Sequence, residues 1–503
     1  MRLVVSCGLA IGCNLHRSCK PKTRLSCDIS QLDQIVPDDF EGQVKYSFFI
    51  GMLRSLGFME EFSTEELGHF VRTLSASFDE IEVLSLFEER LHVSSSSEDR
   101  GPLREVRTHS LMFTGIRKQR LHRFSICADD RDKLKGRIIA PSIDESEISS
   151  FSLNSPERDL MQIGANFDGG EYRSSSELLR RSEEYQRKLG QKWPNLDVIL
   201  HFEQDHSKTA LVNSHGVKGR YEKTFMRTIV LFKDRTLNTH SNIWNYVPVD
   251  FEDLADSIEN RLVRMGKPAS FLQNLQGSLP VLLSPRVVET ICCIIAGAAR
   301  LGLKWDTSMF SVLPDAFQLI DEPYLNGGYR SAPFDDEGTP TSRKTICYGP
   351  DRVTPFSDLA TAHEHLTKST GNGFRRGPFF EPSSDRPPSC HPSNLMLRPG
   401  EARSSDILTD HDQVLLLTQI PIPFSQLSGA GNMPSTVSLI GEIYQHGKHA
   451  AYWSGKRRVS SQSTTSRPGS FLGLIDRSAI VLKDGNLMAA GWFPHIFVPE
   501  MRW

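Results

Sequence analysis

Three consecutive acids, Asp335, Asp336 and Glu337, are the residues of this chain whose types and spacing most favour chemistry. They follow the aromatic Phe334 and precede Gly338, a pattern typical of a strand that ends in a turn. Clustered carboxylates can bind a cation or the amino terminus of a peptide. The alternative is an acidic turn whose carboxylates accept hydrogen bonds from nearby backbone N–H groups. The residues alone leave both interpretations open.

A second candidate is a glycine-rich loop, in which Gly371, Asn372 and Gly373 precede Arg375 and Arg376. The N–H groups of such a loop, together with guanidinium groups, can hold a carboxylate or a carbonyl oxygen. Asn-Gly is equally a common turn of a β-hairpin, so this alternative also stays open. Further along, Asn394 stands ahead of a short apolar run and indicates the start of a strand.

Histidines and cysteines offer weaker candidates for a metal site. His363 and His365 would share a face on a strand, but the stretch 357–362 before them favours a helix, on which the two side chains diverge. Four cysteines crowd the first 27 residues without any Cys-x-x-Cys pair, which disfavours a zinc site built from them with His16. These four are Cys7, Cys13, Cys19 and Cys27.

The bulk composition argues against nucleic acid and membrane as partners. The chain has 503 residues, with 58 basic and 61 acidic side chains and a formal charge of −3, which gives no reason to expect nucleic acid or an acidic membrane surface. No apolar run approaches the roughly 18–20 residues that a membrane helix needs. The cysteines beyond the N-terminal group are scattered, as in a reducing compartment. We therefore expect a cytoplasmic protein.

Local patterns predict the elements that must position these residues. A capping box at Ser63–Glu66 predicts a helix, and Ser174 begins another that we expect to end at Gly190. Strand-like runs at 196–202 and 209–213 follow it. A third, buried helix is predicted over Ser284–Leu301, with an N-cap hydroxyl ahead of Pro285.

These elements indicate three regions. Residues 1–60 are expected to be a poorly ordered extension, and residues 61–275 an N-terminal α/β domain in which strands interleave with helices. Residues 276–503 are expected to form a mainly β domain, because their short apolar runs are cut by Gly, Pro and Asn. The expected fold class is α+β.

Three islands of sequence resemble the TldD/PmbA family, best known for metal-dependent peptidases and their partner subunits. They are Asp335–Gly338, Thr370–Gly373, and Asn394-Leu395 with Pro399-Gly400. A softer match lies at Ala210–Gly216. The resemblance covers roughly residues 65–503 and implies an α/β N-terminal domain with a barrel-like C-terminal domain. It also implies a cavity for unfolded peptide, with peptide-binding residues Asp335, Asp336, Glu337, Gly338, Gly371, Asn372, Gly373, Arg375 and Asn394.

The resemblance also implies which branch of the family to expect. Catalytic members hold zinc with two histidines of a His-Glu-x-x-x-His helix and a cysteine near the C-terminus. Here Ser284 and Glu289 stand where the histidines would fall, and no cysteine follows Cys390. A TldE/PmbA-like subunit is therefore implied, with no catalytic residues and no cofactor of its own.

Such a subunit pairs with a zinc-bearing TldD-like metallopeptidase subunit as a heterodimer, or forms a homodimer, and takes a peptide substrate in peptide maturation or degradation. The alternative is a peptidase or hydrolase in its own right. It would use a non-standard metal or carboxylate site built from Asp335–Glu337 with His363 or His365.

Overall fold

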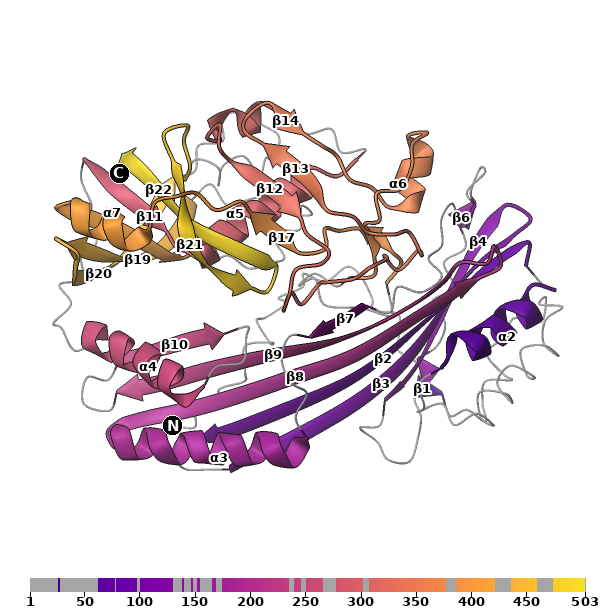
Figure 1. Ribbon diagram of the computed structural model, residues 1–503, viewed down its shortest axis with the longest axis horizontal. Coiled ribbons are helices and arrows are strands. Elements are labelled where there is room, and N and C mark those ends of the chain that lie inside the picture. The colour runs from indigo at the N-terminus through magenta and orange to yellow at the C-terminus, as the bar shows by residue number, and fades with distance from the viewer. Residues whose placement is uncertain are drawn as a thin grey trace, which may run out of the picture.

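Two sheets make up most of the molecule, and one lies above the other in Figure 1. The computed structural model describes residues 26–27, 62–76, 78–96, 100–129, 138–139, 146–147, 152–153, 165–168, 174–234, 239–245, 250–265, 277–301, 307–376, 386–420, 436–458 and 474–502. The predicted extension, residues 1–60, lies outside them except for Ser26–Cys27 (β1), which pairs with Ile138–Ile139 (β5).

The first sheet has eight strands, in the order β10-β9-β8-β2-β3-β4-β6 with β7 beside β9. Every pairing in it is antiparallel except β7 with β9. Its strands are β2 (Glu80–Ser96), β3 (Arg100–Arg117), β4 (Arg120–Asp129), β6 (Ser146–Glu147), β7 (Ala165–Asp168), β8 (Leu196–Asn213), β9 (Lys218–Asp234) and β10 (Thr239–Asn245). The two runs predicted at 196–202 and 209–213 are one strand, because the polar stretch between them continues the pairing with both neighbours.

Helices α2 (Thr64–Leu74), α3 (Ser175–Lys192) and α4 (Phe251–Met265) pack on this sheet (Figure 1). The capping box of α2 is confirmed: the Ser63 hydroxyl accepts from the N–H of Glu66, whose carboxylate accepts from the N–H of Ser63. The predicted end of α3 at Gly190 is wrong, since the helix continues to Lys192. Its C-cap is Trp193, which precedes Pro194 and is therefore disfavoured in the helical conformation.

The second sheet has ten strands and a mixed arrangement, in the order β14-β13-β12-β17-β22-β11-β18-β19-β20 with β21 beside β22. Its strands are β11 (Ser278–Leu283), β12 (Gln318–Asp321), β13 (Lys344–Tyr348), β14 (Arg352–Val353), β17 (Leu395–Leu397), β18 (Gln413–Gln419), β19 (Thr436–Gln445), β20 (Lys448–Arg458), β21 (Ile480–Met488) and β22 (Gly491–Arg502). The smaller elements of this region are β15 (Gly373–Phe374), β16 (Ser389–Cys390), η2 (Thr307–Val312), α6 (Leu359–Glu364) and α7 (Ser404–Asp410).

The α+β class is confirmed, whereas "barrel-like" describes the second sheet only loosely. Within the described residues its strands form an open path from β14 to β20 and do not close. A barrel needs a pairing between the two end strands, and strands as short as β14 have few backbone groups to supply one.

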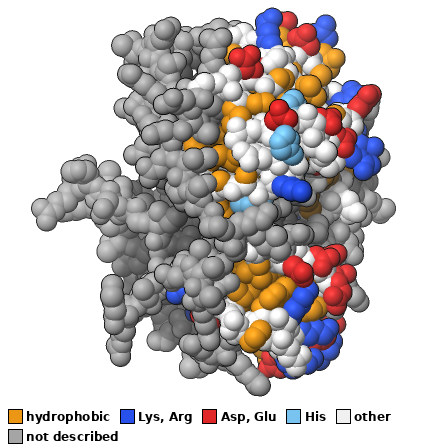
Figure 2. Space-filling view, turned by 90° about the vertical axis from the view of Figure 1, so that its left-hand side faces the viewer, with side chains coloured by type: hydrophobic (Ala, Val, Ile, Leu, Met, Phe, Trp, Pro, Cys, Tyr) orange, Lys and Arg blue, Asp and Glu red, His pale blue; other side chains and the backbone are white. Residues whose placement is uncertain are grey.

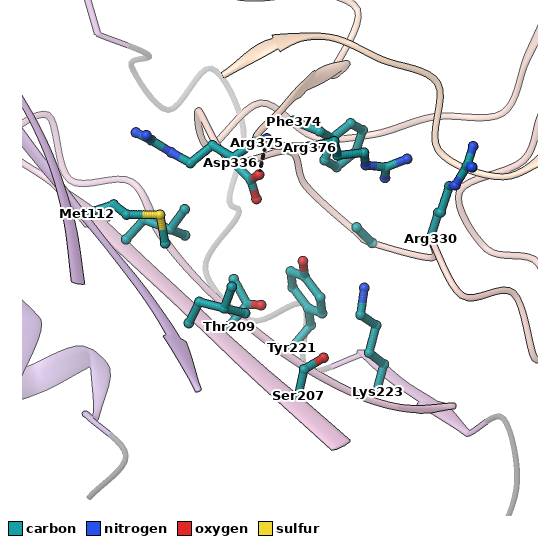
Figure 3. Close-up of a pocket in the computed structure, with 13 residues that line it drawn as sticks. Met112, Ser207, Thr209, Tyr221, Lys223, Arg330, Asp336, Phe374, Arg375 and Arg376 are labelled. Carbon is teal, nitrogen blue, oxygen red and sulfur yellow. Dashed lines mark hydrogen bonds between the residues drawn. The ribbon is translucent and has the colours of Figure 1, made fainter. Parts of the chain in front are cut away.

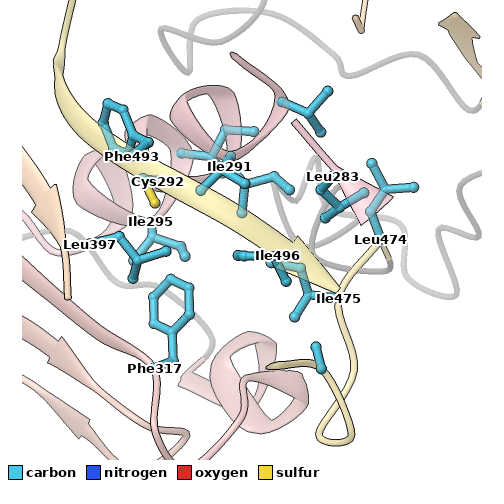
Figure 4. Close-up of a cluster of buried hydrophobic side chains, with 14 of the residues drawn as sticks. Leu283, Ile291, Cys292, Ile295, Phe317, Leu397, Leu474, Ile475, Phe493 and Ile496 are labelled. Carbon is cyan, nitrogen blue, oxygen red and sulfur yellow. The ribbon is translucent and has the colours of Figure 1, made fainter. Parts of the chain in front are cut away.

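Helix α5 (Pro285–Ala298) is the centre of the largest apolar core. As predicted, it begins with Ser284 at the N-cap and proline at the first helical position, but it ends at Ala298, before the predicted Leu301. The Ser284 hydroxyl makes no capping bond and donates to the Thr418 carbonyl instead. Its buried face includes Ile291 and Ile295, and these meet Phe493 and Ile496 of β22 (Figure 4). A helix with so wide an apolar face is stabilised mainly by this packing.

Replacing Ile294 with aspartate is expected to abolish soluble expression. Ile294 is 3% exposed on α5, so the substitution removes apolar contacts and strands a carboxylate in an apolar site. Arg286→Asp is the matched control, because Arg286 is exposed in the first turn of the same helix, where an acid is favoured. Soluble yield and melting temperature are the measurements, and a soluble Ile294→Asp protein with a native melting temperature would contradict the expectation.

The surface mixes both signs of charge. On the face shown in Figure 2, acidic and basic side chains are interspersed over the coloured region, in keeping with the formal charge of −3. No helix in the described part of the chain is long and apolar enough to cross a membrane.

Candidate functional site

A cavity of about 40 Å³ lies between the first sheet and the loops of the C-terminal region (Figure 3). Strands β2, β3, β8 and β9 form one wall, and the segments 330–336 and 374–376 form the other. The lining residues are Leu84, Leu86, Met112, Ser207, Thr209, Tyr221, Lys223, Arg330, Ala332, Asp336, Phe374, Arg375 and Arg376.

The sheet wall follows from the two-residue period of a strand. Thr209 of β8 stands opposite Tyr221 of β9, and Ser207 stands opposite Lys223, so two cross-strand rows point the same way. The residues between them, such as Ala210, belong to the core on the helix-covered side of the sheet. Because side chains alternate between the two faces of the sheet, the β8–β9 hairpin presents polar residues to the cavity and apolar residues to the core.

Phe334 joins the two regions. Its buried ring lies edge-on to the ring of Tyr221, with centroids 5.1 Å apart. A Cβ atom on Gly219, two residues before Tyr221 in strand β9, would lie 2.5 Å from the Phe334 ring. Glycine at this position therefore lets the aromatic ring rest directly on the sheet.

Asp335 acts as a turn cap. One of its oxygens accepts from the N–H groups of Glu337 (3.1 Å) and Thr339 (2.8 Å), and the other accepts from Gly373 (2.8 Å). Burial raises the pKa of Asp335 to about 8, against the lowering effect of these bonds. The carboxyl group thus holds two loops together and does not line the cavity.

Asp336 is the acid that faces the cavity (Figure 3). Its Oδ2 accepts from the backbone N–H of Arg375 at 2.6 Å. Burial raises the pKa of Asp336, while Arg375, Arg376 and Lys223 oppose the rise. Asp336 is therefore the one carboxylate among the residues that line the cavity.

Glu337 and Glu82 form a buried carboxyl pair behind the cavity. Glu337 Oε2 accepts from the N–H of Leu359 at 2.8 Å, and Glu82 Oε2 has no hydrogen-bond partner within the described residues. Burial raises the pKa of Glu82 to about 8, and the carboxylate of Glu337 adds to the rise. Arg375 and Arg123 oppose it.

Stability should fall as pH rises from about 5 to 8, and Glu82→Gln should reduce this dependence. A folded-state pKa above the unfolded value means that the folded chain binds more protons across this window, so stability is present at low pH and is lost as pH rises. One such group contributes up to about 1.4 kcal/mol per pH unit. Urea unfolding of both proteins at several pH values measures the slope. Glu65→Gln, on the exposed side of α2, is the control; equal slopes for wild type and Glu82→Gln would refute the assignment.

The conformation of the glycine-rich loop is fixed by hydrogen bonds of Asn372 and by two glycines that pack tightly against neighbouring atoms. Gly371 has φ +73°, and a Cβ atom there would lie 2.4 Å from the carbonyl oxygen of Pro340. Asn372 is fully buried and donates to Asp321 and to the carbonyl of His391. A Cβ atom on Gly373 would overlap the Glu337 carboxylate. The loop is therefore shaped to bring Arg375 and Arg376 to the cavity.

Asn394 has a supporting position. Its Oδ1 accepts from the N–H of Arg330 at 3.0 Å, and its amide group donates to the Ser331 hydroxyl and to the Glu322 carbonyl. These bonds fix the segment that presents Arg330 to the cavity.

Of the predicted peptide-binding residues, Asp336 and Arg375 line the cavity. Asp335, Glu337, Gly338, Gly371, Asn372, Gly373 and Asn394 lie behind it and shape its loops. The sequence interpretation missed Tyr221, Lys223 and Arg330. Polar residues at alternate positions of β9 were the available signal for the first two, whereas Arg330 stands in a loop without periodicity.

The N-terminal end of α5 does not fit a zinc ion. Ser284 Oγ lies 3.3 Å from the carbonyl oxygen of Thr418, and Glu289 Oε1 accepts from the N–H of Ala490 at 2.8 Å. A hydroxyl and one carboxylate engaged with the backbone do not make the nitrogen and sulfur donor set that zinc prefers. The described residues contain no group of three or more His, Cys, Asp or Glu side chains that could hold a metal.

His363 and His365 lie at the end of α6, as the preceding residues predicted. His363 is in the helix, and His365 is its C-cap. Successive helical residues are rotated by about 100°, so the two side chains do not share a face.

Comparisons with known proteins agree with this fold. Residues 276–439 match the family described as "PmbA/TldA metallopeptidase C-terminal domain". No curated protein sequence is significantly similar to the chain. Among solved structures, TldE from Thermococcus kodakarensis has a TM-score of 0.67 and 16% identity, over 88% of this chain and 99% of that one.

Two further structures are described as putative modulators of DNA gyrase. The protein from Thermotoga maritima has a TM-score of 0.64 and 17% identity, over 88% of this chain and 100% of that one. The protein from Bacteroides thetaiotaomicron has a TM-score of 0.63 and 13% identity, over 87% and 98%. These likenesses show a shared fold over nearly the whole chain. Residues 276–439 in addition resemble the C-terminal domain of the PmbA/TldA metallopeptidase family.

Proposed function

We propose that this chain is a non-catalytic, TldE/PmbA-like subunit of a peptidase complex. It shapes a peptide-binding cavity for a zinc-bearing TldD-like partner in peptide maturation or degradation. One observation carries the proposal: Ser284 and Glu289, which the resemblance places where catalytic members have zinc-binding histidines, both contact backbone groups. The proposed setting is the cytoplasm, and the proposed assembly is a heterodimer with such a partner or a homodimer.

The cavity supports a role in binding peptide. It combines cations, hydroxyl groups, one carboxylate and an apolar wall, which together suit the mixed polarity of an extended peptide. One wall of the cavity belongs to the first sheet and the other to the C-terminal region, and a shared apolar cluster packs the two walls together. Arg375 also links the two walls, because its guanidinium group donates to the Thr114 hydroxyl of β3.

Co-expression with a TldD-like protein that carries the His-Glu-x-x-x-His helix tests the proposal. We expect the two chains to co-purify, with zinc and peptide hydrolysis in the pair and neither in this chain alone. Mutation of the partner's histidines should then remove hydrolysis while the pair remains intact. A chain that never associates with such a partner would contradict the proposed role.

A second candidate function is a hydrolase in its own right. It is favoured by Asp336, the carboxyl group that lines the cavity and whose pKa burial raises, since a carboxylic acid that stays protonated near neutral pH can act as a general acid. Metal analysis and peptide hydrolysis by the purified chain alone separate the two candidates. Stoichiometric metal whose removal abolishes hydrolysis would favour the second.

A further inference from the structure

The cavity carries more positive than negative charge. Lys223, Arg330, Arg375 and Arg376 line it with Asp336 as the single carboxylate. Burial lowers the pKa of Lys223 to about 8 and that of Arg376 to about 9, and repulsion from neighbouring cations adds to both shifts. A buried anion in the cavity would relieve this repulsion.

Neutral oxygens hold three of the cations in place. Lys223 Nζ donates to the Tyr329 carbonyl at 3.1 Å, and a guanidinium nitrogen of Arg376 donates to the Pro392 carbonyl at 2.7 Å. Arg375 donates to the Arg386 carbonyl and the Thr114 hydroxyl. These bonds orient the cations without cancelling their charge.

Nearby acids outside the lining are occupied elsewhere. Glu88 and Asp205 lie close enough to Lys223 to affect its pKa, but both contact Arg90, at 3.2 Å and 3.9 Å. Burial raises the pKa of Glu82, which favours its neutral form. Asp321 lies close enough to Arg330 and Arg376 to affect their pKa, but it pairs with Lys344 at 3.3 Å. The excess positive charge therefore remains on the cavity side.

The other lining groups narrow the choice of anion. Leu84, Leu86 and Met112 form an apolar wall beside the cations, and Phe374 lies across from it. Asp336 would repel a dianion such as phosphate, but it can accept a hydrogen bond from an N–H group. The cavity volume of about 40 Å³ favours a small side chain on the residue that enters it.

We propose that this cavity binds the C-terminal residue of a peptide. The terminal carboxylate would contact Lys223, Arg330 and Arg376, and the N–H of the last residue would donate to Asp336. A small apolar side chain would lie against Leu84 and Met112. This inference rests on the proposed function and adds to it the end of the peptide that is recognised.

Paired peptides test the inference on the purified chain alone. Two hexapeptides of one sequence, fluorescently labelled at the N-terminus and ending in alanine, would carry either a free carboxylate or an amide. Fluorescence anisotropy should show about tenfold tighter binding of the free acid, because a charge-assisted bond is lost in the amide. Added salt should weaken the acid more than the amide.

Variants localise the effect. Lys223→Gln and Arg376→Gln each remove a positive charge and leave a shorter, polar side chain in its place. Each should weaken binding of the acid about tenfold and leave the amide nearly unchanged. Lys188→Gln is the matched control, because Lys188 of α3 does not line the cavity and pairs with Glu184 and with the Phe251 ring. The comparison of acid and amide on the unmutated chain stands even if a variant fails to fold.

Three outcomes would overturn the inference. They are equal binding of acid and amide, no binding of either, and displacement of the peptide by inorganic phosphate at lower concentrations than by acetate. The last would identify a general oxyanion site. None of them affects co-purification with a TldD-like partner, so failure here is distinguishable from failure of the proposed function.

Discussion

Asp335→Ala is expected to destabilise the protein severely, whereas Asp336→Ala, one residue further, should leave it folded. Asp335 accepts three buried backbone N–H groups, and each buried donor left without a partner costs about 1–3 kcal/mol. We therefore expect the free energy of unfolding to fall by about 3 kcal/mol or more. Asp336 accepts one such bond, from Arg375, and its loss should cost about 1 kcal/mol.

Function should change in the opposite order. Asp336→Ala removes the one cavity carboxylate, so peptide cleavage by the assembled pair should drop per folded molecule. Asp335→Asn is an intermediate test: it keeps an oxygen for Glu337 and Thr339 but points an amide N–H group at the N–H of Gly373. Urea unfolding and specific activity on one preparation measure both effects. A purely thermal defect in Asp336→Ala would refute its assignment to the binding site.

Phe334→Ala is expected to lower the free energy of unfolding by about 3–5 kcal/mol, because it empties a fully buried aromatic site between the two regions. Gly219→Ala disrupts the same contact from the side of the sheet, because the new Cβ atom would overlap the Phe334 ring. Overpacking of this kind costs about 1–3 kcal/mol.

The double variant Gly219→Ala/Phe334→Ala provides the control. Once the ring is gone, the methyl group on residue 219 has room, so the two costs should not add. Additive costs would show that Phe334 does not rest on Gly219. Gly190→Ala, with open space around the new Cβ in α3, should be neutral or stabilising.

Local signals predicted the helices well. The capping box at Ser63–Glu66 and the Ser284-Pro285 start of α5 both depend on neighbouring residues alone, and both are confirmed. The end of α3 was misplaced because glycine inside a helix costs little when packing holds it. The restriction that Pro194 places on Trp193 sets the actual end.

The site was predictable only in part, for a physical reason. The acids 335–337 are adjacent in sequence, yet the backbone turns so that Asp335 caps, Asp336 faces the cavity and Glu337 caps the segment at Leu359. No pattern in the sequence states which way each side chain points in a turn. Lys223 lies more than a hundred residues before Arg330, and only the packing of sheet against loops brings them together.

The alternation along the β8–β9 hairpin also limits how this chain can change in length over evolution. Ser207, Thr209, Tyr221 and Lys223 face the cavity because each lies two residues from the next on its strand. A single inserted or deleted residue within either strand would turn one wall of the cavity toward the helix-covered core and bring core side chains to the cavity. Substitutions can accumulate in these strands, but we expect gaps in alignments of relatives to fall in the loops or to come in pairs of residues.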